Sequence, residues 1–381
     1  MRMLVLGSGL QGSACAYDLL QDKGVSEVRL ADVHVGHLPE FLAPYSGPRL
    51  IPTPLDVRDH SAVLGAMRQC DAVMSAIPYY FNYDMARLAV DAGVHFCDLG
   101  GNTEIVFKQK ELDPEARKKN ITIVPDCGLA PGMVNILAEH GINQLDTVDS
   151  VKIFVGGLPQ HPEPPLNYML VYSLEGALDY YTTLSWVLRK GKRTQVKALS
   201  ERESVAFESP LGELEAFHTA GGLSTMAFRY EGKIPTMEYK TLRYPGHAAI
   251  MENIREIGLL GLEPVEVKGM KVVPRDVFIA IVGPRLNKPH GRDIVALRVA
   301  VSGTKSGKSA TKTFQLVDRY DEAHGVSAMM RTTGYSLAIT GLMQVRGQVK
   351  PAGVHTPDEC IPADTYIAEL RKRGVDIKEL S

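Results

Sequence analysis

The chain has 381 residues, more than a single hydrophobic core usually serves, so we expect two domains. Hydrophobic residues make up 45% and charged residues 23%, which is typical of a mixed α/β protein and excludes a disordered or fibrous chain. The 42 basic and 44 acidic residues give a net charge of −2, which favours neither nucleic acid nor an anionic membrane as a partner. A small-molecule partner is therefore expected.

The five cysteines are odd in number and widely separated, without the CxxC spacing of zinc or dithiol sites. We expect reduced thiols and no metal. The sequence enters an apolar strand at once, over residues 1–7, which is too short for a secretory signal, and no window is long enough to span a membrane. A cytoplasmic protein is therefore predicted.

The first third alternates short β-rich runs with helical segments, which predicts parallel strands joined by helical crossovers. The expected fold is α/β, with a doubly wound parallel sheet of the Rossmann type. The predicted strands are 2–7, 28–32, 50–56, 72–77, 95–99 and 121–126, and the predicted helices are 11–23, 59–69, 83–92 and a longer one from Asn102 to about Asn120.

A glycine-rich turn lies between the first strand and the first helix, with the sequence Gly7-Ser8-Gly9-Leu10-Gln11-Gly12. In a dinucleotide fold the first glycine permits the tight turn, the second admits the pyrophosphate and the third lets helix and strand pack closely. The phosphates would bind the free N–H groups at the helix N-terminus. The motif predicts a cofactor site formed by Gly7, Gly9, Leu10, Gln11 and Gly12.

Asp32 lies twenty positions after Gly12, at the end of the second strand, where a ribose-binding carboxylate belongs. A carboxylate accepts hydrogen bonds from the ribose 2′-hydroxyl and repels a 2′-phosphate, so NAD is predicted rather than NADP. Arg29 could attract a phosphate, but an ordinary surface charge is the simpler interpretation.

The ends of the following strands extend the predicted crevice, because ligands of open α/β sheets bind at the carboxyl ends of strands. Asp56 and Asp98 could instead cap the helices that follow them. The further cofactor candidates are Asp56, Val57, Ala76, Ile77, Pro78, Asp98 and Gly100.

After a helix predicted over residues 133–143, the pattern changes to longer runs with period-two alternation, which indicates a mixed or antiparallel sheet. Residues 213–219 and 236–244 are two such strands, and 296–302 and 311–316 are expected to form a hairpin. An apolar helix over 326–344 is expected to return to the first domain. We therefore predict an NAD-binding domain over 1–128, an inserted α+β domain for substrate binding and dimerisation over 129–326, and a returning segment over 327–381.

Several segments in order resemble the saccharopine dehydrogenase-like family, and most closely its L-lysine 6-dehydrogenase branch. The resemblance implies NAD-dependent oxidation of the side-chain amine of L-lysine to the semialdehyde with release of ammonia, in a homodimer without a metal. Relatives that act on saccharopine are the alternative, and a non-catalytic NAD(H)-binding protein is another. The segments are 5–10, 125–135, 162–168, 173–176, 214–219, 221–222, 239–244, 246–247 and 331–333.

Hydride can leave the carbon only when its amine is uncharged, yet a free lysine amine has a pKa of about 10.4, so the site needs a base. Asp126, at the end of the sixth strand, and His247, after the turn that ends the strand 236–244, are the candidates. Arg243 is suited to a bidentate grip on a carboxylate. Alternation places Thr241 on the same strand face as Arg243. Tyr79 and His218 are further substrate-binding candidates.

Overall fold

The computed structural model describes residues 1–36 and 38–380. Within these residues, seven strands form a parallel sheet in the order β17-β6-β5-β4-β1-β2-β3. The strand order reverses direction at β1, as in a doubly wound sheet, which confirms the predicted fold class. Its strands are β1 (Arg2–Leu6), β2 (Glu27–Asp32), β3 (Leu50–Pro54), β4 (Ala72–Ser75), β5 (His95–Asp98), β6 (Thr122–Val124) and β17 (Gly353–Val354).

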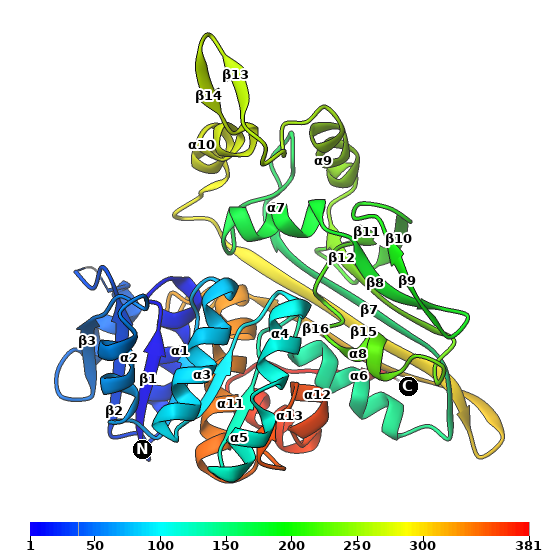
Figure 1. The fold of residues 1–381 in the computed structure, drawn as a ribbon. Helices are drawn as coiled ribbons and strands as arrows, with labels where there is room; N and C mark the ends of the chain where they lie inside the picture. Colours follow the sequence, from blue (N-terminus) through cyan, green and yellow to red (C-terminus); the bar gives the residue numbers. More distant parts are fainter. Residues whose placement is uncertain (37, 381) are drawn as a thin grey trace.

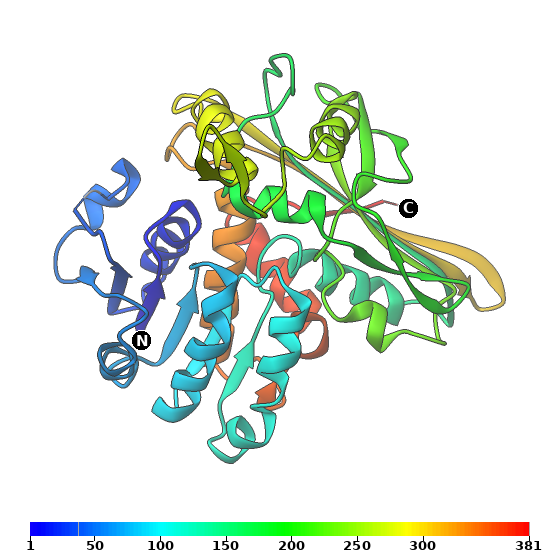
Figure 2. The same ribbon diagram turned by 45° about the horizontal axis from the view of Figure 1, so that its top comes forward.

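Helices cover both faces of this sheet (Figures 1 and 2). They are α1 (Leu10–Gln21), η1 (Glu40–Tyr45), α2 (His60–Met67), η2 (Tyr79–Phe81), α3 (Asn82–Ala92), α4 (Thr103–Lys110) and α5 (Asp113–Lys118). The single long helix predicted after Asn102 is wrong, since α4 and α5 are separate. Pro114 lacks an N–H group and fits the first turn of a new helix, so it begins α5 instead of continuing α4.

A second sheet follows α6 (Met133–Asn143) and is mixed. Among the described residues, β12 and β7 are the only neighbouring strands of this sheet that pair in parallel. The predicted hairpin is present, with Leu297 opposite Leu316 and Ser302 opposite Thr311. Nine strands of the described residues belong to it, seven of them in the order β10-β11-β12-β7-β15-β16-β18. They are β7 (Thr147–Pro159), β8 (Ser185–Arg189), β9 (Lys192–Val196), β10 (Glu203–Ala206), β11 (Glu213–His218), β12 (Thr236–Arg243), β15 (Asp293–Lys305), β16 (Lys308–Arg319) and β18 (Lys378–Leu380).

Further helices and a hairpin accompany this sheet (Figure 1). Leu178 and Tyr181 of α7, Met251 of α9 and Phe278 of α10 share one apolar cluster with Phe217 of β11. These elements are α7 (Leu174–Thr182), α8 (Met226–Arg229), α9 (His247–Glu256), α10 (Pro274–Leu286) and the hairpin β13 (Val265–Val267) with β14 (Met270–Val272).

The C-terminal segment packs against the first domain, beginning with a π-helical turn, η3 (Met330–Gly334), that leads into α11 (Tyr335–Val345). Gly334 lies so close to α1 that a Cβ atom there would be 2.6 Å from the Ala14 side chain. After β17, α12 (Pro357–Cys360) and α13 (Ala363–Lys372), the segment departs from its predicted course, because β18 pairs with β16 of the second sheet.

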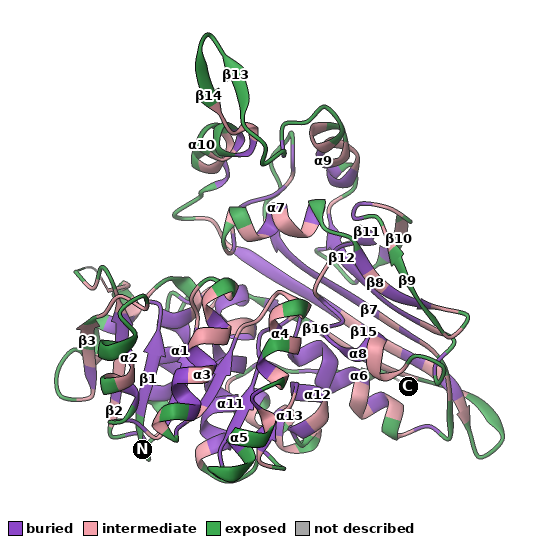
Figure 3. Ribbon diagram, in the orientation of Figure 1, coloured by how far each residue is buried: buried purple, intermediate pink, exposed green. Residues whose placement is uncertain are grey.

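Burial follows this architecture, with the strands of both sheets buried and the hairpin β13–β14 exposed (Figure 3). One apolar cluster includes Val5 and Met74 of the first sheet together with Val299 and Leu316 of the second, so the two domains share a core. The five free cysteines are all buried. Among the described residues, no helix has the length and hydropathy that a membrane crossing requires.

Candidate active site

The glycine turn has the geometry of a dinucleotide site. Gly7 has φ +94°, and a Cβ atom there would lie 2.7 Å from the Ala76 carbonyl oxygen, while one at Gly12 would lie 1.8 Å from the Gly7 carbonyl oxygen. Both positions therefore require glycine for the packing of the protein itself. Gly9 is different, because a Cβ atom there would meet nothing within 4 Å. The protein leaves space at the position where a pyrophosphate approaches the backbone.

Side chains around this turn also fit a cofactor. The amide nitrogen and oxygen of Gln11 are both buried without a hydrogen-bond partner. Leu10 and Val33 are each 51% exposed. Unsatisfied buried polar atoms are costly, so a ligand that bonds Gln11 would stabilise the site.

Asp32 ends β2 beside the glycine turn. Its carboxylate accepts the N–H groups of Ser8 at 2.7 Å and His34 at 3.2 Å. Partial burial raises the pKa of Asp32, but these backbone donors outweigh it and hold the pKa below its ordinary value, so the group is negatively charged at neutral pH. Arg29 bonds Glu27 at 2.6 Å and Gln69 at 2.8 Å, which agrees with a surface charge.

The residues at the ends of β3 and β4 differ in how well they fit the predicted cofactor crevice. Ala76 and Ile77 flank Gly7, and Pro78 follows them before η2. Val57 packs against the core of the first domain. The Asp56 carboxylate is bound by Arg58 at 2.6 Å, which lowers its pKa to about 2.

Neither of the two strand-end aspartates caps the helix that follows it. Asp59, not Asp56, caps α2 by accepting the Ala62 N–H, and Asn102, not Asp98, caps α4. Asp98 is fully buried, and its carboxylate accepts the Gly100 N–H and the Gln109 amide, both at 2.7 Å. We therefore correct its predicted role: its side chain cannot touch a cofactor directly and holds the Gly100 turn instead.

Asp126 lies just beyond β6, buried and with φ +63°. Its carboxylate accepts the Gly101 N–H at 3.1 Å, and a Cβ atom at Gly100 would lie 1.6 Å from it. Burial raises the pKa of Asp126 to about 7, and the charge of Asp98 adds to the effect. A carboxyl group with a pKa near neutrality can both accept and donate a proton, which suits a general base or acid.

Arg243, on β12, is the second group with an unusual environment. It is 2% exposed, its guanidinium lies 4.7 Å from the Tyr168 ring centre, and its Nε atom has no hydrogen-bond partner. The phenol groups of Tyr172 and Tyr181 also lie near it. No carboxylate among the described residues forms an ion pair with Arg243, whereas the other buried cations all have one: Lys240 with Glu203, Arg275 with Asp179, and Arg331 with Asp318 and Asp321.

Thr241, another predicted residue, lies on the same strand as Arg243. We call Tyr239, Thr241 and Arg243 the site face of β12, because alternate residues share a face. The Thr241 hydroxyl bonds that of Thr219 at 2.7 Å. Tyr180 of α7 lies near both Asp126 and Tyr239, which connects Asp126 to the site face.

Tyr79 reaches this region from the first domain. Partial burial, followed by the carboxylates of Asp179 and Glu175 on α7, raises the pKa of its phenol, which places it beside α7. The structure thus brings Tyr79 of the first domain near α7 of the second.

The surroundings of His247 disfavour its predicted role as a base. It is not on a loop but begins α9, 2% exposed, with Nδ1 2.9 Å from the Leu166 carbonyl oxygen and Nε2 3.0 Å from the Tyr181 hydroxyl. Burial and the nearby Arg243 charge lower its pKa to about 3. Both ring nitrogens of His247 are engaged in contacts within the protein, which leaves neither of them free for a substrate proton.

His218 is also wrong as a substrate residue, because it belongs to the opposite face. It pairs in register with Lys240, and we call Glu238, Lys240 and His218 the network face. Here His218 lies 3.1 Å from Glu201, and Arg189 bonds both Glu201 and Glu238 at 2.7 Å. Two carboxylates and an imidazole could hold a metal ion, but the Arg189 guanidinium already occupies the position between the carboxylates.

The tyrosines around Arg243, and the neighbours Tyr180 and Ser224 of Asp126, were not predicted from the sequence. A signal was present, since four tyrosines fall within residues 168–181. Two cavities, of about 460 and 430 Å³, lie elsewhere among charged residues and contain none of the predicted site residues.

Comparisons with known proteins agree with this organisation. Residues 3–124 match the saccharopine dehydrogenase NADP binding domain, and residues 128–375 match the saccharopine dehydrogenase C-terminal domain. A saccharopine dehydrogenase (NADP(+), L-glutamate-forming) of Saccharomyces cerevisiae is 24% identical over 412 residues, which cover 89% of this chain and 90% of the relative. A carboxyaminopropylagmatine dehydrogenase of Synechocystis is 21% identical over 409 residues, which cover 100% of this chain and 97% of the relative.

Among solved structures, apo saccharopine dehydrogenase (L-Glu forming) from Saccharomyces cerevisiae aligns with a TM-score of 0.81 at 22% identity, over 100% of this chain and 99% of its own. These matches confirm the resemblance at the level of the family. They favour the saccharopine alternative over the lysine 6-dehydrogenase branch, because the matching domains and the relative with this fold carry saccharopine names. The chain belongs to the saccharopine dehydrogenase family of NAD(P)-dependent dehydrogenases.

Proposed function

We propose that the chain is a saccharopine-type oxidoreductase that acts on the C–N bond of a secondary amine bearing a carboxylate. The observation that carries this proposal is Arg243, a buried guanidinium without an acidic partner. A buried charge is costly unless it is paired, so a substrate carboxylate would supply the missing partner and bind tightly there.

Asp126 is the proposed proton acceptor. The substrate amine is protonated at neutral pH and must lose its proton before hydride can leave the adjacent carbon. With a pKa of about 7, Asp126 is partly ionised at neutral pH and can take this proton. It can then activate the water that hydrolyses the imine, and it donates the proton when the reaction runs in reverse.

A bound nicotinamide cofactor would supply the hydride acceptor, held by the glycine turn, Gln11 and Asp32. We propose NAD rather than NADP, because the Asp32 carboxylate is negatively charged and would repel a 2′-phosphate. The matching N-terminal domain is named for NADP. A measurement of the preference for NAD over NADP would therefore test the proposed role of Asp32 directly.

Oxidation of the ε-amine of L-lysine is a second candidate function. It is favoured by the number of buried cations that lack a carboxylate partner, because that number limits how many substrate carboxylates the site can bind. Saccharopine carries several carboxylates and lysine carries one. Among the buried cations that the structure describes, Arg243 is the one left without a carboxylate. A single buried anion site therefore suits the smaller substrate.

One assay separates these functions. Purified protein is mixed with NAD⁺ or NADP⁺ and with saccharopine, L-lysine or other amino acids, and the absorbance of the reduced cofactor is followed. Saccharopine-dependent reduction with release of glutamate would support the main proposal. Lysine-dependent reduction with release of ammonia would support the second, and cofactor binding without turnover of any substrate would contradict both.

A further inference from the structure

The ring of His247 is enclosed by aromatic side chains beside Arg243. It stacks on Phe217, with the ring centres 6.3 Å apart and an interplanar angle of 11°. It also meets Tyr168 and Tyr181 edge to face, at 5.5 and 5.8 Å. Arg243 contacts the same cluster, because its guanidinium lies over the Tyr168 ring. The His247 ring is therefore held in one orientation within the surroundings of Arg243.

The hydrogen bonds of His247 fix the position of its proton. Nδ1 lies 2.9 Å from the Leu166 carbonyl oxygen, and a carbonyl oxygen can only accept a hydrogen bond, so Nδ1 carries a proton. Burial, with the Arg243 charge adding to it, lowers the pKa of His247 to about 3, so the ring is neutral and Nε2 carries none. Nε2 lies 3.0 Å from the Tyr181 hydroxyl, which is therefore the donor in that bond.

This direction determines what Tyr181 offers to its other neighbour. A phenol has one proton, and because the Tyr181 proton points to His247, only lone pairs remain on the phenol oxygen. The guanidinium of Arg243 lies beside this phenol. The lone pairs attract the cation, whereas a freely rotating hydroxyl could turn its proton towards it. His247 therefore holds Tyr181 in the orientation that attracts Arg243.

The other contacts of Arg243 orient its guanidinium without neutralising it. Nη1 donates to the Leu242 carbonyl oxygen at 2.8 Å. Burial raises the pKa of Tyr168 to about 12, so the phenol beneath the guanidinium is uncharged at neutral pH. Nε has no hydrogen-bond partner among the described residues. The charge of Arg243 and its Nε donor thus remain available for a carboxylate.

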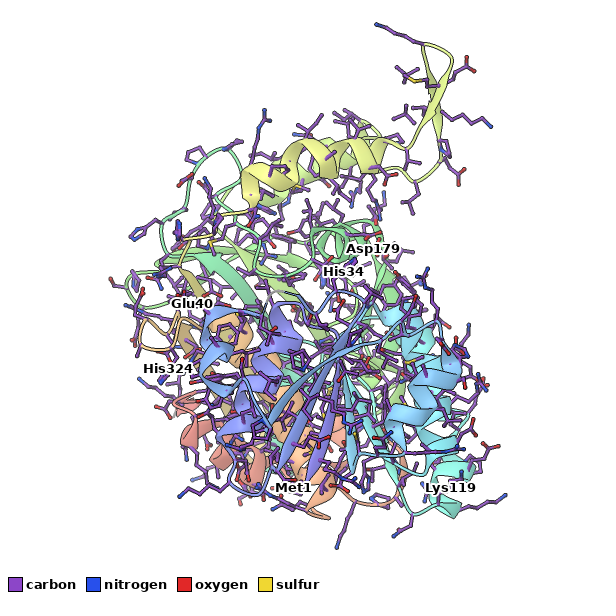
Figure 4. All side chains as sticks on the ribbon, turned by 90° about the vertical axis from the view of Figure 1, so that its left-hand side faces the viewer. Met1, His34, Glu40, Lys119, Asp179 and His324 are labelled. Atoms are coloured by element: carbon purple, nitrogen blue, oxygen red, sulfur yellow. The ribbon has the colours of Figure 1, made fainter. Side chains whose placement is uncertain are left out.

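These contacts join segments that are distant in the sequence. Tyr181 is on α7, His247 begins α9 and Arg243 ends β12. Figure 4 shows α7, marked by Asp179, between the first domain and α10. The orientation of the guanidinium therefore depends on how α7 and α9 pack on β12.

We propose that His247 and Tyr181 are positioning residues, which act through Arg243 and hold its guanidinium in the orientation that binds the substrate carboxylate. The inference rests on the proposed function, because it takes the carboxylate at Arg243 as given. A mobile side chain must be ordered when its ligand binds, so an Arg243 that is already ordered binds the carboxylate more tightly.

The first test compares KM with kcat for a substrate that bears a carboxylate. Tyr181→Phe removes the hydroxyl and keeps the ring, so it should raise KM about 10-fold and change kcat less than about 3-fold. Tyr244→Phe is the matched control, because the Tyr244 hydroxyl donates to the Pro159 carbonyl oxygen at 3.0 Å and follows Arg243 on the opposite face of the strand. It should leave both constants unchanged. Circular dichroism checks that the variants are folded.

Two substitutions of His247 give a rescue test. Glutamine can place its amide oxygen near the position of Nε2 and accept the bond from Tyr181, whereas the shorter asparagine does not reach it. KM should therefore rise about 10-fold in His247→Asn and less than about 3-fold in His247→Gln. Equal KM values in the two variants would mean that the bond to Tyr181 does not matter, which would overturn the proposal.

The protonation of His247 can be tested without any turnover. In ¹⁵N spectra of the full chain labelled at histidine, the His247 ring should be neutral at pH 5, with its proton on Nδ1. The spectrum of His247→Gln identifies the signals. A proton on Nε2, or a charged ring at pH 5, would reverse the direction of the bond to Tyr181 and overturn the proposal.

Arg243→Gln distinguishes a failure of this inference from a failure of the proposed function. In the Arg243→Gln background, Tyr181→Phe should raise KM less than about 2-fold, because no guanidinium remains to be oriented. An unchanged KM in Arg243→Gln alone would contradict the proposed function and the inference with it. If Arg243→Gln raises KM but Tyr181→Phe does not, or if their effects multiply in the double variant, the proposed function stands and the positioning role is overturned.

Discussion

The two faces of β12 both bury charged residues, but they pair them differently. On the network face, Arg189 bonds Glu201 and Glu238, so the buried charges are compensated within the chain. On the site face, Arg243 has tyrosines around it and no carboxylate. A compensated network is stable without a ligand, whereas an unpaired buried cation becomes more stable when an anion binds. Unpaired buried charge, more than a titratable residue as such, therefore indicates the site.

The largest expected effect is at Asp126, which lies beside the site face. Asp126→Asn removes the proposed proton acceptor and should lower kcat by about 1000-fold. The amine oxidation rate of the wild type should rise with pH through about 7, because the ionised form of Asp126 is the active one. Steady-state kinetics between pH 5 and 9 would show this rise in the wild type and its loss in the variant.

Asp98→Asn is the matched control for this prediction. The negative charge of Asp98 raises the pKa of Asp126, so its removal should move the rise in rate to lower pH without abolishing it. An Asp126→Asn enzyme with an unchanged pH profile would assign the proton chemistry to another group.

Substitutions of Arg243 and Arg189 test directly whether the two faces of β12 differ in function. Arg243→Gln removes the proposed carboxylate partner and should lower kcat/KM by about 100-fold or more, chiefly through KM. Arg189→Gln leaves Glu238 with Lys152, at 3.4 Å, as its remaining salt-bridge partner and should lower the free energy of unfolding by about 2 kcal/mol with little change in KM. Kinetics and chemical denaturation of both variants give the two quantities. Equal effects of the two substitutions on KM would remove the distinction between the faces.

Much of the first domain could be predicted because its signals are local. Strand periodicity, the glycine turn and Asp32 lie within short segments, and each carries its own steric or electrostatic reason. Arg243 and Thr241 could be placed on one face by alternation alone. Asp126 could be proposed from its place at the end of the sixth predicted strand, but only the fold explains the raised pKa of its buried carboxyl group.

The remainder depends on contacts between distant segments. The tyrosines around Arg243 come from residues 168–181, which reach β12 only when α7 packs on the second sheet. The burial of His247 depends on α9, which the period-two pattern did not predict. The face of the sheet on which His218 lies is set by its pairing with Lys240 between β11 and β12. Spacing in the sequence does not define the register of that pairing.

The first domain contains a similar contrast, between Asp32 and Asp98. Asp98 is closed off by its bonds with Gly100 and Gln109, while the Asp32 carboxylate is only partly buried. Asp32→Ala should weaken NAD binding by about 10-fold and reduce the preference for NAD over NADP, because the repulsion of a 2′-phosphate is lost. Titration of cofactor fluorescence with each nucleotide measures both. An unchanged ratio of the two affinities would show that Asp32 does not select the cofactor.

The smallest expected effect on the pH profile is at His247. With a pKa of about 3 it stays neutral over the working range, so His247→Asn should leave the rise in rate near pH 7 in place. The same shift predicts a stability effect. Because the folded pKa is depressed, unfolded chains take up a proton as pH falls below about 6.5 while folded chains do not, so stability is lost between about pH 6.5 and 3. The variant should lose less Tm than the wild type between pH 7 and 4. A pH profile that moved in this variant would return His247 to the proton chemistry and would end the assignment of that role to Asp126 alone.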